Sequence, residues 1–412
     1  MATTERTVYI AGAGIAGLTL ALALARFELK IVVLERTQTI EVEGAGLQIS
    51  PNARRVLDRL GLSEALDKMG FEPQGIDIYP FRCPSPIVTL ELGEAARQQF
   101  MAPYCVIHRA DLAQALFSAC KRFANIDIQF GIANFDLVTH ARGLSLSVDK
   151  ASGGQHHDAR PHAFVGADGV NSPTRTKILG GPEARYSGFC AWRAMVPIST
   201  MANTLNLDNT SLLWAPGFHL VAYPHPIRKQ VNIVLATKEK LAAITQSSLR
   251  KKSFLRKKPS LPNMMLKSKI IEDIIATVGN GWKMWPLNAV TSDKWHQGPV
   301  GLIGDAAHAM LPFQAQGAAM AIEDAAILAP LLASDLKADA AFERYESLRK
   351  KRVERVARLS ARNASFYHME WPFSLTRDTV ISAQGPKAHF ERLGWIYNYD
   401  SEAALNKSAP LP

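Results

Sequence analysis

The stretch Thr7-Val-Tyr-Ile-Ala-Gly12-Ala-Gly14-Ile-Ala-Gly17-Leu-Thr-Leu-Ala-Leu-Ala-Leu-Ala-Arg26 joins an apolar run to a glycine-rich turn and an Ala/Leu-rich segment. The run Thr7–Ala11 predicts a short buried strand, and Leu18–Arg26 predicts a helix. Ile31–Leu34 predicts a second strand shortly afterwards. A strand, turn, helix and strand in this order form a βαβ unit, which brings two parallel strands side by side.

The glycines of the Gly12-x-Gly14-x-x-Gly17 turn meet three different steric needs. Gly12 lets the chain turn after the strand, Gly14 lets a pyrophosphate approach the backbone, and Gly17 lets the helix and strand pack closely. The N-terminus of the helix offers unpaired N–H groups to phosphates. Glu35 ends the second strand, with 17 residues between it and Gly17, where it can accept hydrogen bonds from a ribose. The set predicts a dinucleotide site.

Two further acidic residues follow apolar strands. Phe164–Asp168 predicts a strand that runs into Asp168-Gly169, and Val300–Ile303 predicts another before Gly304-Asp305. Ligands of open α/β sheets bind beyond the carboxyl ends of the strands, so both carboxylates are expected at the same site. A helix predicted over Gly317–Leu332 begins close to Asp305 in sequence, and its N-terminus could stabilise negative charge on a bound ring.

Together these three motifs resemble those of the class A flavoprotein aromatic hydroxylases, of the p-hydroxybenzoate and salicylate hydroxylase type. The motifs occur in the family's order and at its usual distances, and further echoes are Gly44–Asn52, His108–Leu112 and Ala315–Asp324. The resemblance covers nearly the whole chain. It implies an α/β fold: a Rossmann-like FAD-binding domain of the glutathione-reductase type, an inserted β-sheet substrate domain and a C-terminal helical segment.

The 412 residues are too many for one simple core and suggest interleaved domains. Short runs such as Ile76–Tyr79, and the predicted antiparallel pair Phe218–Tyr223 and Val231–Leu235, predict the inserted sheet. Ala341–Asn363 predicts a long amphipathic helix. We expect an FAD-binding domain from 1–75, 105–180 and 285–370, a substrate domain from 76–104 and 181–284, and a C-terminal segment over 371–412.

Carried over position by position, the resemblance implies a set of cofactor contacts. The glycines would meet the FAD diphosphate, Glu35 the adenosine ribose and Asp305 the ribityl chain. NADH or NADPH is the implied co-substrate. The residues expected to bind FAD are Gly12, Gly14, Ala16, Gly17, Glu35, Arg36, Gln48, Arg109, Asp168, Gly169, Asp305, Gln316, Gly317 and Ala318.

The substrate is expected at Gln48, His219, Tyr223 and Pro312, with the last three as the catalytic candidates. His219 and Tyr223 are four apart on a predicted strand, so they share a face and lie roughly 13 Å apart if fully extended. A histidine can accept a phenol proton, whereas the structural alternative is a core histidine and a packing tyrosine. Arg193 could pair with a substrate carboxylate, or it could serve the structure as an ion pair or as an arginine stacked on a ring, and both interpretations stay open.

The implied reaction is hydroxylation of a small phenolic, salicylate-like or hydroxypyridine-like ring by NAD(P)H and O2 through a flavin C4a-hydroperoxide, with no metal. Two alternatives stay open. One is a membrane-associated hydroxylase of a quinone precursor, and the other is a non-catalytic flavin-binding protein. A disulfide reductase is disfavoured because the chain has no closely spaced cysteine pair.

The formal charge of +10 is unevenly spread, because eight Lys or Arg and no acid lie between Leu249 and Ile271. We interpret this segment as a solvated surface, and a weak contact of Arg250–Lys269 with an anionic membrane is the alternative. Aromatic residues interleave it only at Phe254, which argues against nucleic-acid binding. The N-terminus shows no signal peptide, so we expect a cytoplasmic protein, either a monomer or a homodimer.

Overall fold

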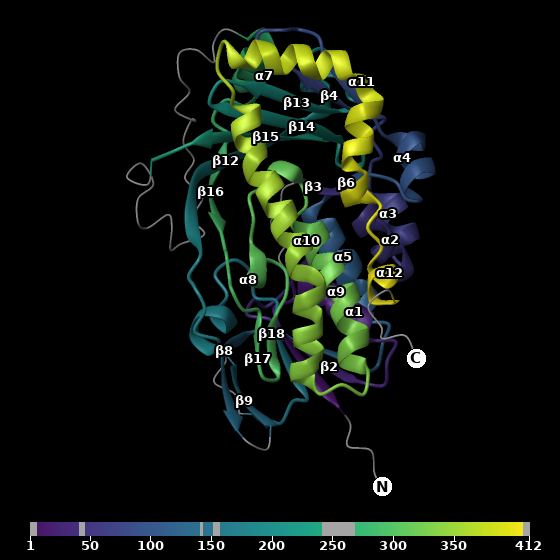
Figure 1. Cartoon of the computed structure of the whole chain (residues 1–412), viewed down its shortest axis with the longest axis vertical. Coiled ribbons are helices and arrows are strands. Elements are labelled where there is room, and N and C mark those ends of the chain that lie inside the picture. The colour runs from purple at the N-terminus through teal and green to yellow at the C-terminus, as the bar shows by residue number, and fades with distance from the viewer. Residues whose placement is uncertain (1–5, 41–45, 141–142, 151–156, 241–267, 407–412) are drawn as a thin grey trace.

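A six-stranded sheet forms around the predicted βαβ unit (Figure 1). The computed structural model describes residues 6–40, 46–140, 143–150, 157–240 and 268–406. Five strands of the sheet are parallel, and β17 pairs antiparallel at one edge. In spatial order the strands are β17 (His296–Gln297), β18 (Val300–Leu302), β11 (Ala163–Gly166), β1 (Thr7–Ala11), β2 (Lys30–Leu34) and β7 (Ile126–Gln129).

Both faces of this sheet are buried, which explains why its strands are continuous apolar runs. Val8 and Ile10 of β1 face a core shared with helices, whereas Tyr9 and Ala11 face a second core under a small antiparallel sheet. The helices are α1 (Ile15–Leu24), α5 (Arg109–Cys120) and α9 (Gly317–Ala333), and the small sheet is β8 (Ile132–His140), β9 (Gly143–Lys150) and β10 (His157–Ala159).

A seven-stranded sheet makes up the other half of the fold. Helix α7 (Lys269–Val278) packs against its outer face. All neighbouring pairs are antiparallel except β13 with β4. In spatial order the strands are β16 (Lys283–Ala289), β12 (Arg185–Pro197), β15 (Gln230–Lys238), β14 (Phe218–His225), β13 (Thr210–Ala215), β4 (Gly75–Tyr79) and β5 (Val88–Glu91).

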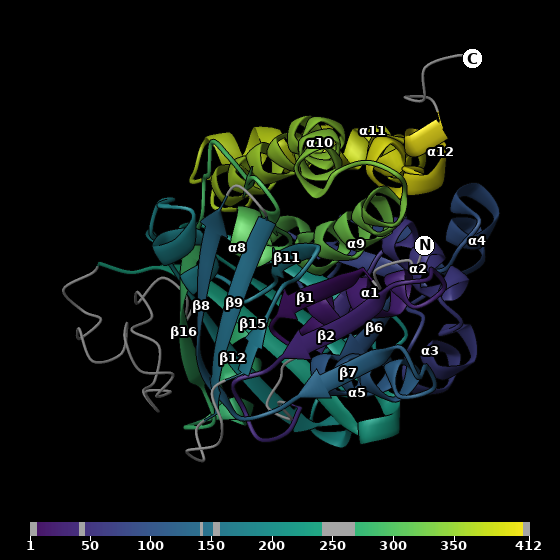
Figure 2. The same ribbon diagram turned by 90° about the horizontal axis from the view of Figure 1, so that it is seen from below.

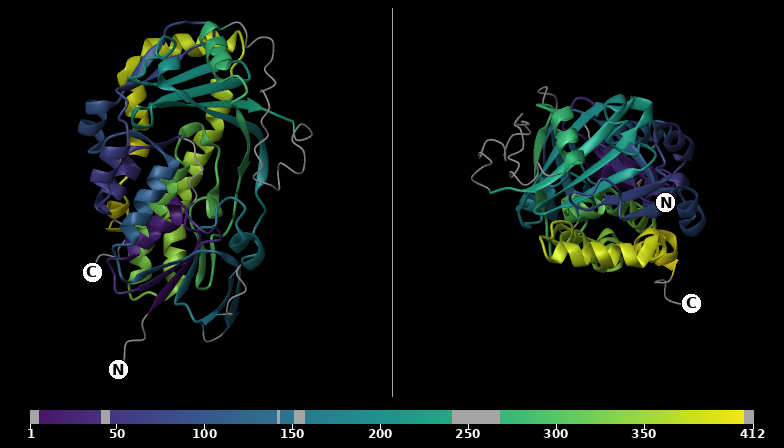
Figure 3. Two further views of the ribbon diagram at one scale, coloured as in Figure 1. Left: turned by 180° about the vertical axis from the view of Figure 1, so that it is seen from behind. Right: turned by 90° about the horizontal axis from the view of Figure 1, so that it is seen from above.

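Helices bridge the two halves. Figure 1 shows α10 (Ala338–Tyr367) running along the molecule from the lower sheet to the upper one, and α11 (Phe373–Tyr397) crossing the upper end. In Figure 2 these helices form a layer on one side, with α9 beneath them, and Figure 3 shows the sheets from behind and from above. The remaining strands and α-helices of the described residues are β3 (Gly46–Ile49), β6 (Cys105–His108), α2 (Pro51–Arg59), α3 (Ser63–Met69), α4 (Gly93–Phe100), α8 (Asp305–His308) and α12 (Ser401–Asn406).

The predicted fold class is confirmed, and the predicted helices differ from the structure mainly at their ends. The helix predicted over Ala341–Asn363 spans Ala338–Tyr367, because the apolar stripe continues through buried Ala338 and Ala364. The division into domains by residue range stays a prediction. The basic segment between Leu249 and Ile271 lies outside the described residues as far as position 267 and is described only from Ser268 onward. Within the described ranges, every helix is too short or too polar to cross a membrane.

Candidate active site

A cavity of about 2410 Å³ connects the carboxyl ends of the parallel strands with the inner face of the seven-stranded sheet. Gly12, Glu35 and Asp168 line one end, and His219 and Tyr223 line the other. Cavities for drug-sized ligands occupy roughly 300–1,000 Å³. This cavity therefore has room for a dinucleotide and a small second molecule together.

The glycine turn after β1 is tightly packed on the side of helix α1 and open on the side of the cavity. Gly12 has a φ of +104°, and a Cβ on Gly17 would lie 1.9 Å from the carbonyl oxygen of Gly12. Helix α1 therefore packs directly against the turn. A Cβ on Gly14 would meet no atom within 4 Å, and Gly14 lines the cavity. The backbone is thus exposed to a ligand at the point where a pyrophosphate is expected.

Two carboxylates at this end of the cavity have accepting capacity left. Glu35 accepts from the backbone N–H of Ala13 at 2.8 Å and from the N–H and hydroxyl of Thr37, both at 2.9 Å. A carboxylate has about four acceptor sites, so one is left for a ribose hydroxyl. Asp168 accepts twice from Thr174 through Oδ2, while its buried Oδ1 has no partner among the described residues.

Two helix N-termini point their unpaired N–H groups at the same space. Helix α1 begins after Gly14 and α9 begins after Gln316, and no side chain caps either helix. Gly317 and Ala318 at the start of α9 line the cavity. Such N-termini favour phosphates and other negative charge. With the exposed turn and the unpartnered Asp168 oxygen, the residues at this end fit FAD.

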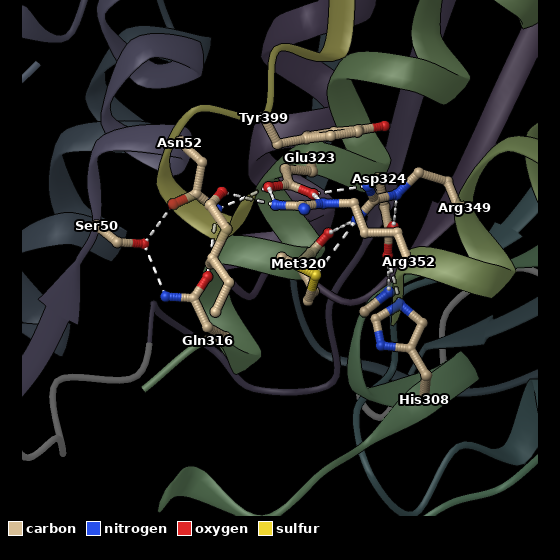
Figure 4. Close-up of polar contacts among 12 residues, drawn as sticks. Ser50, Asn52, His308, Gln316, Met320, Glu323, Asp324, Arg349, Arg352 and Tyr399 are labelled. Carbon is tan, nitrogen blue, oxygen red and sulfur yellow. Dashed lines mark hydrogen bonds and ion pairs between the residues drawn. The ribbon is translucent and has the colours of Figure 1, made fainter. Parts of the chain in front are cut away.

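A buried polar network, which includes Asp324, His308 and Arg349 (Figure 4), holds the Gly304–Asp305 turn in place. Asp324 accepts from the backbone N–H of Gly304 at 3.0 Å and lies 2.6 Å from Nε2 of His308. Arg349 donates from Nε to Asp324 at 2.8 Å and from Nη1 to Glu323 at 2.6 Å. Burial disfavours the charge on Asp324, but His308 and Arg349 outweigh it and lower the pKa to about 2. The network therefore fixes where Asp305 enters the cavity.

The network continues to α2 through Gln316 (Figure 4). The side chain of Gln316 donates to Ser50 at 2.9 Å and accepts from Asn52 at 3.2 Å, and Asn52 also donates to Glu323 at 2.7 Å. Gln316 is only 1% exposed and does not line the cavity. Its side chain therefore connects α9 to α2, and only the main chain after it faces a ligand.

The far end of the cavity is one face of the seven-stranded sheet. Alternation along β14 places His219, Val221 and Tyr223 on this face, as predicted, while Phe218 and Leu220 face the core under α7. Val221 pairs with Val234, which pairs with Arg193 of β12, so Arg193 lies on the same face two strands away. These side chains surround the space left for a small molecule.

His219 sits among aromatic rings and a second histidine. Its ring meets Phe313 edge-on with centroids 4.7 Å apart and Tyr367 at 5.2 Å. Its Nδ1 lies 2.8 Å from Nε2 of His368. Burial and, to a smaller extent, His368 hold the pKa of His219 well below its usual range. His219 is therefore neutral at pH 7 in the absence of a negatively charged partner.

Tyr223 has a different environment at the other end of β14. It packs beneath β3, because a Cβ on Gly46 would lie 2.6 Å from its hydroxyl oxygen. Burial raises the pKa of Tyr223, and the charge of Arg193 opposes this increase. His219 and Tyr223 therefore line different parts of the sheet face. Gln48 on β3 is close by, where it accepts from the hydroxyl of Tyr104 at 2.6 Å.

Arg193 is a cation without a matching anion in the described part of the chain. Its Nε is buried and has no hydrogen-bond partner there. Its guanidinium lies 5.8 Å from the ring centroid of Trp285, near the limit of a cation–π contact. Burial lowers its pKa and Tyr223 opposes that shift. The structural ion pair considered for Arg193 is absent from the described residues, and the guanidinium is available to an anion in the cavity.

Most of the predicted site residues come together in the cavity. Gly17 and Gln316 lie behind the lining. Sequence reasoning missed His368, Phe313 and Arg349, which have no local motif and reach the site only through α10 and the Pro312–Gln314 turn. The predicted residues that line the cavity are Gly12, Gly14, Ala16, Glu35, Arg36, Gln48, Arg109, Asp168, Gly169, His219, Tyr223, Asp305, Pro312, Gly317 and Ala318.

Comparisons with known proteins agree with this geometry. The model of a family described as "FAD binding domain" matches residues 5–360. The chain is 31% identical to 3-hydroxybenzoate 6-hydroxylase 1 of Aquipseudomonas alcaligenes over 96% of this chain and 98% of that one. It is 30% identical to the 3-amino-4-hydroxybenzoate 2-monooxygenase PtmB3 of Streptomyces platensis, with 96% of each covered. A salicylate hydroxylase substrate complex has the same fold, with a TM-score of 0.76, 23% identity and 99% of both chains covered.

Proposed function

The chain belongs to the class A flavoprotein aromatic hydroxylases, and from that premise we propose that its substrate is a small aromatic carboxylate with a ring hydroxyl. It is an FAD-dependent monooxygenase that uses NAD(P)H and O2. The observation that carries the substrate proposal is the shared face of β14 and β12. That face presents to one cavity the neutral base candidate His219 and the cation Arg193, whose Nε has no hydrogen-bond partner among the described residues.

Each part of the site has a separate task in this proposal. FAD, when bound, would supply the redox chemistry that links NAD(P)H to O2. His219 accepts the proton of the ring hydroxyl, which makes the ring more electron-rich and easier to oxygenate. Apolar side chains such as Leu212, Trp214 and Val221 line the same face and exclude water from the reacting ring. Pro312, Tyr223 and Gln48 also line the cavity, and we assign them to the walls of the substrate space.

Arg193 is the reason why we propose a carboxylate on the substrate ring. A guanidinium forms two parallel hydrogen bonds with a carboxylate, and such charge-assisted bonds are stronger than neutral ones. The names of the two relatives above refer to 3-hydroxybenzoate and 3-amino-4-hydroxybenzoate, which are both benzoates. Each bond to a charged group contributes about 1.5–3 kcal/mol, which corresponds to roughly 10–100-fold in affinity.

The test compares 3-hydroxybenzoate with 3-hydroxybenzamide, which keeps the hydroxyl and loses the negative charge. We expect the acid to stimulate NADH oxidation and to give a dihydroxy product, and we expect the amide to bind at least about tenfold more weakly. Arg193→Gln should weaken binding of the acid by a similar factor and leave the affinity for the amide unchanged. If the variant weakens binding of both ligands equally, Arg193 does not bind the carboxylate and supports flavin binding instead. If no hydroxylated aromatic acid is turned over, the substrate proposal fails.

Assembly and location belong to the same proposal. We expect a cytoplasmic protein that is a monomer or a homodimer, which light scattering after gel filtration distinguishes. Of the Arg250–Lys269 segment, only Ser268 and Lys269 are described, and Lys269 forms an ion pair with Asp273 at 2.7 Å. Cell fractionation tests a weak membrane contact, since a membrane-associated pool that salt releases would support it.

A further inference from the structure

His368 is held next to His219 by main-chain and side-chain contacts. It follows the last residue of α10, where its backbone N–H donates to Ala364 and its carbonyl accepts from Gly217, both at 3.2 Å. Gly217 is in the turn that leads into β14. The Nε2 of His368 therefore reaches Nδ1 of His219 at 2.8 Å although the two residues are 149 positions apart. The side chains are 3% and 6% exposed, so solvent does not compete for this bond.

The surroundings keep both imidazoles neutral. Phe313 and Tyr367 pack on the ring of His219, and Phe189 packs on the ring of His368 at 5.7 Å. The charged groups that act on His368 are both cations, Lys238 at the end of β15 and Arg377 on α11. Burial and, to a smaller extent, these two cations lower the pKa of His368 to about 4. No carboxylate contacts either ring within the described ranges.

A hydrogen bond between two neutral imidazoles has two forms. A neutral imidazole carries one N–H and one bare nitrogen. If Nδ1 of His219 donates, its Nε2 is bare and can accept a proton from a ligand. If His368 donates instead, Nε2 of His219 carries a hydrogen and cannot act as a base. His219 lines the cavity and uses Nδ1 for His368, so Nε2 is the nitrogen left for a substrate.

We propose that His368 is a positioning residue that accepts a hydrogen bond from Nδ1–H of His219 and so keeps Nε2 of His219 bare toward the substrate. In this form His368 carries its own hydrogen on Nδ1, which is buried and has no hydrogen-bond partner among the described residues. This inference rests on the proposed role of His219 as the base for the ring hydroxyl. The proton leaves the hydroxyl oxygen of the substrate and binds Nε2, while the Nδ1–H bond stays intact. The resulting imidazolium donates to the bare Nε2 of His368, which stabilises the new charge in the same way that an acceptor orients the histidine of a catalytic triad.

Nitrogen-15 NMR of the histidine-labelled holoenzyme reads the tautomer directly. The signals of His219 are assigned by their loss in His219→Gln, and His140→Gln is the control for removing an exposed histidine on β8. We expect a bare Nε2 and a protonated Nδ1 in the wild-type protein at pH 7.5. We expect the two states to exchange in His368→Phe, which offers no acceptor. A protonated Nε2 in the wild-type protein would overturn the proposal.

Kinetics separate positioning from a structural role. With the preferred aromatic acid, His368→Phe should lower kcat by about 10–100-fold, less than the roughly 10²–10⁴-fold of a lost general base because His219 itself remains, and should change the substrate Kd by less than about threefold. His368→Gln can place an acceptor near the position of Nε2 and should recover most of the loss. Equal losses in both variants, with the tautomer of His219 unchanged, would show that His368 only supports packing. If the NMR result holds but no aromatic acid is hydroxylated, the positioning stands and the proposed function fails.

Discussion

Replacing Arg349 by methionine tests whether its positive charge stabilises the fold by compensating the buried carboxylates of Glu323 and Asp324. Arg349, Glu323 and Asp324 are all 0% exposed, and the guanidinium bonds to both carboxylates at 2.6 and 2.8 Å. Arg349→Met keeps an apolar side chain of related length but leaves two buried carboxylates short of a cation. Removing one partner of a buried ion pair costs about 3–5 kcal/mol. We expect the lower end of this range, about 3 kcal/mol, because Arg352 and His308 still contact the carboxylates.

The matched control is Arg358→Met, on the same helix. The ion pair of Arg358 with Glu354 is 3.6 Å long, and the two side chains are 69% and 49% exposed, so its loss should cost less than about 1 kcal/mol. The assay is urea unfolding followed by circular dichroism, with the same excess of FAD in each sample. Equal free energies of unfolding for the two variants would refute the view that Arg349 compensates buried charge.

Four other changes test the same geometry. Gly17→Ala would place a Cβ 1.9 Å from the carbonyl oxygen of Gly12 and should yield insoluble or flavin-free protein. The Cβ of Gly14→Ala would meet no atom within 4 Å, so this variant should fold but bind FAD more weakly. Retention of flavin on gel filtration checks both variants, and a Gly17→Ala protein that keeps its flavin would contradict the first expectation. Asp168→Ala should weaken FAD binding about tenfold by fluorescence titration, because a charged acceptor is lost; unchanged affinity would mean that its free oxygen faces no ligand. The pKa of Asp324 is about 2 in the folded state and 3.8 ordinarily. The ionised carboxylate therefore contributes roughly 2 kcal/mol to the free energy of unfolding above pH 4, and this contribution is lost as the pH falls toward 2. A urea midpoint that stays constant from pH 5 to pH 3 would be inconsistent with this.

Sequence reasoning predicted the parts of the site that depend on local geometry. The turn after β1 favours glycine at Gly12 because its φ is +104°, and it requires glycine at Gly17 because a Cβ there would lie 1.9 Å from the carbonyl oxygen of Gly12, five residues earlier, so both needs come from the path of the turn itself. The shared face of His219 and Tyr223 likewise follows from the two-residue period of a strand. Such features depend on the path of a short segment, so the amino-acid pattern alone determines them.

The tertiary structure decided which side chains are partners. Three features depend on how α9, α10 and the seven-stranded sheet pack: the bond between His219 and His368, the contacts of Arg349 with its two carboxylates, and the unpaired Nε of Arg193 within the described part of the chain. The partners are distant in sequence, and nothing in their local sequence records the pairing. Burial then sets their energetics, because a polar group removed from water is stabilised or penalised according to the neighbour it meets. The chain thus encodes its cofactor turn locally, whereas the protonation and charge balance of its site arise only when the folded elements meet.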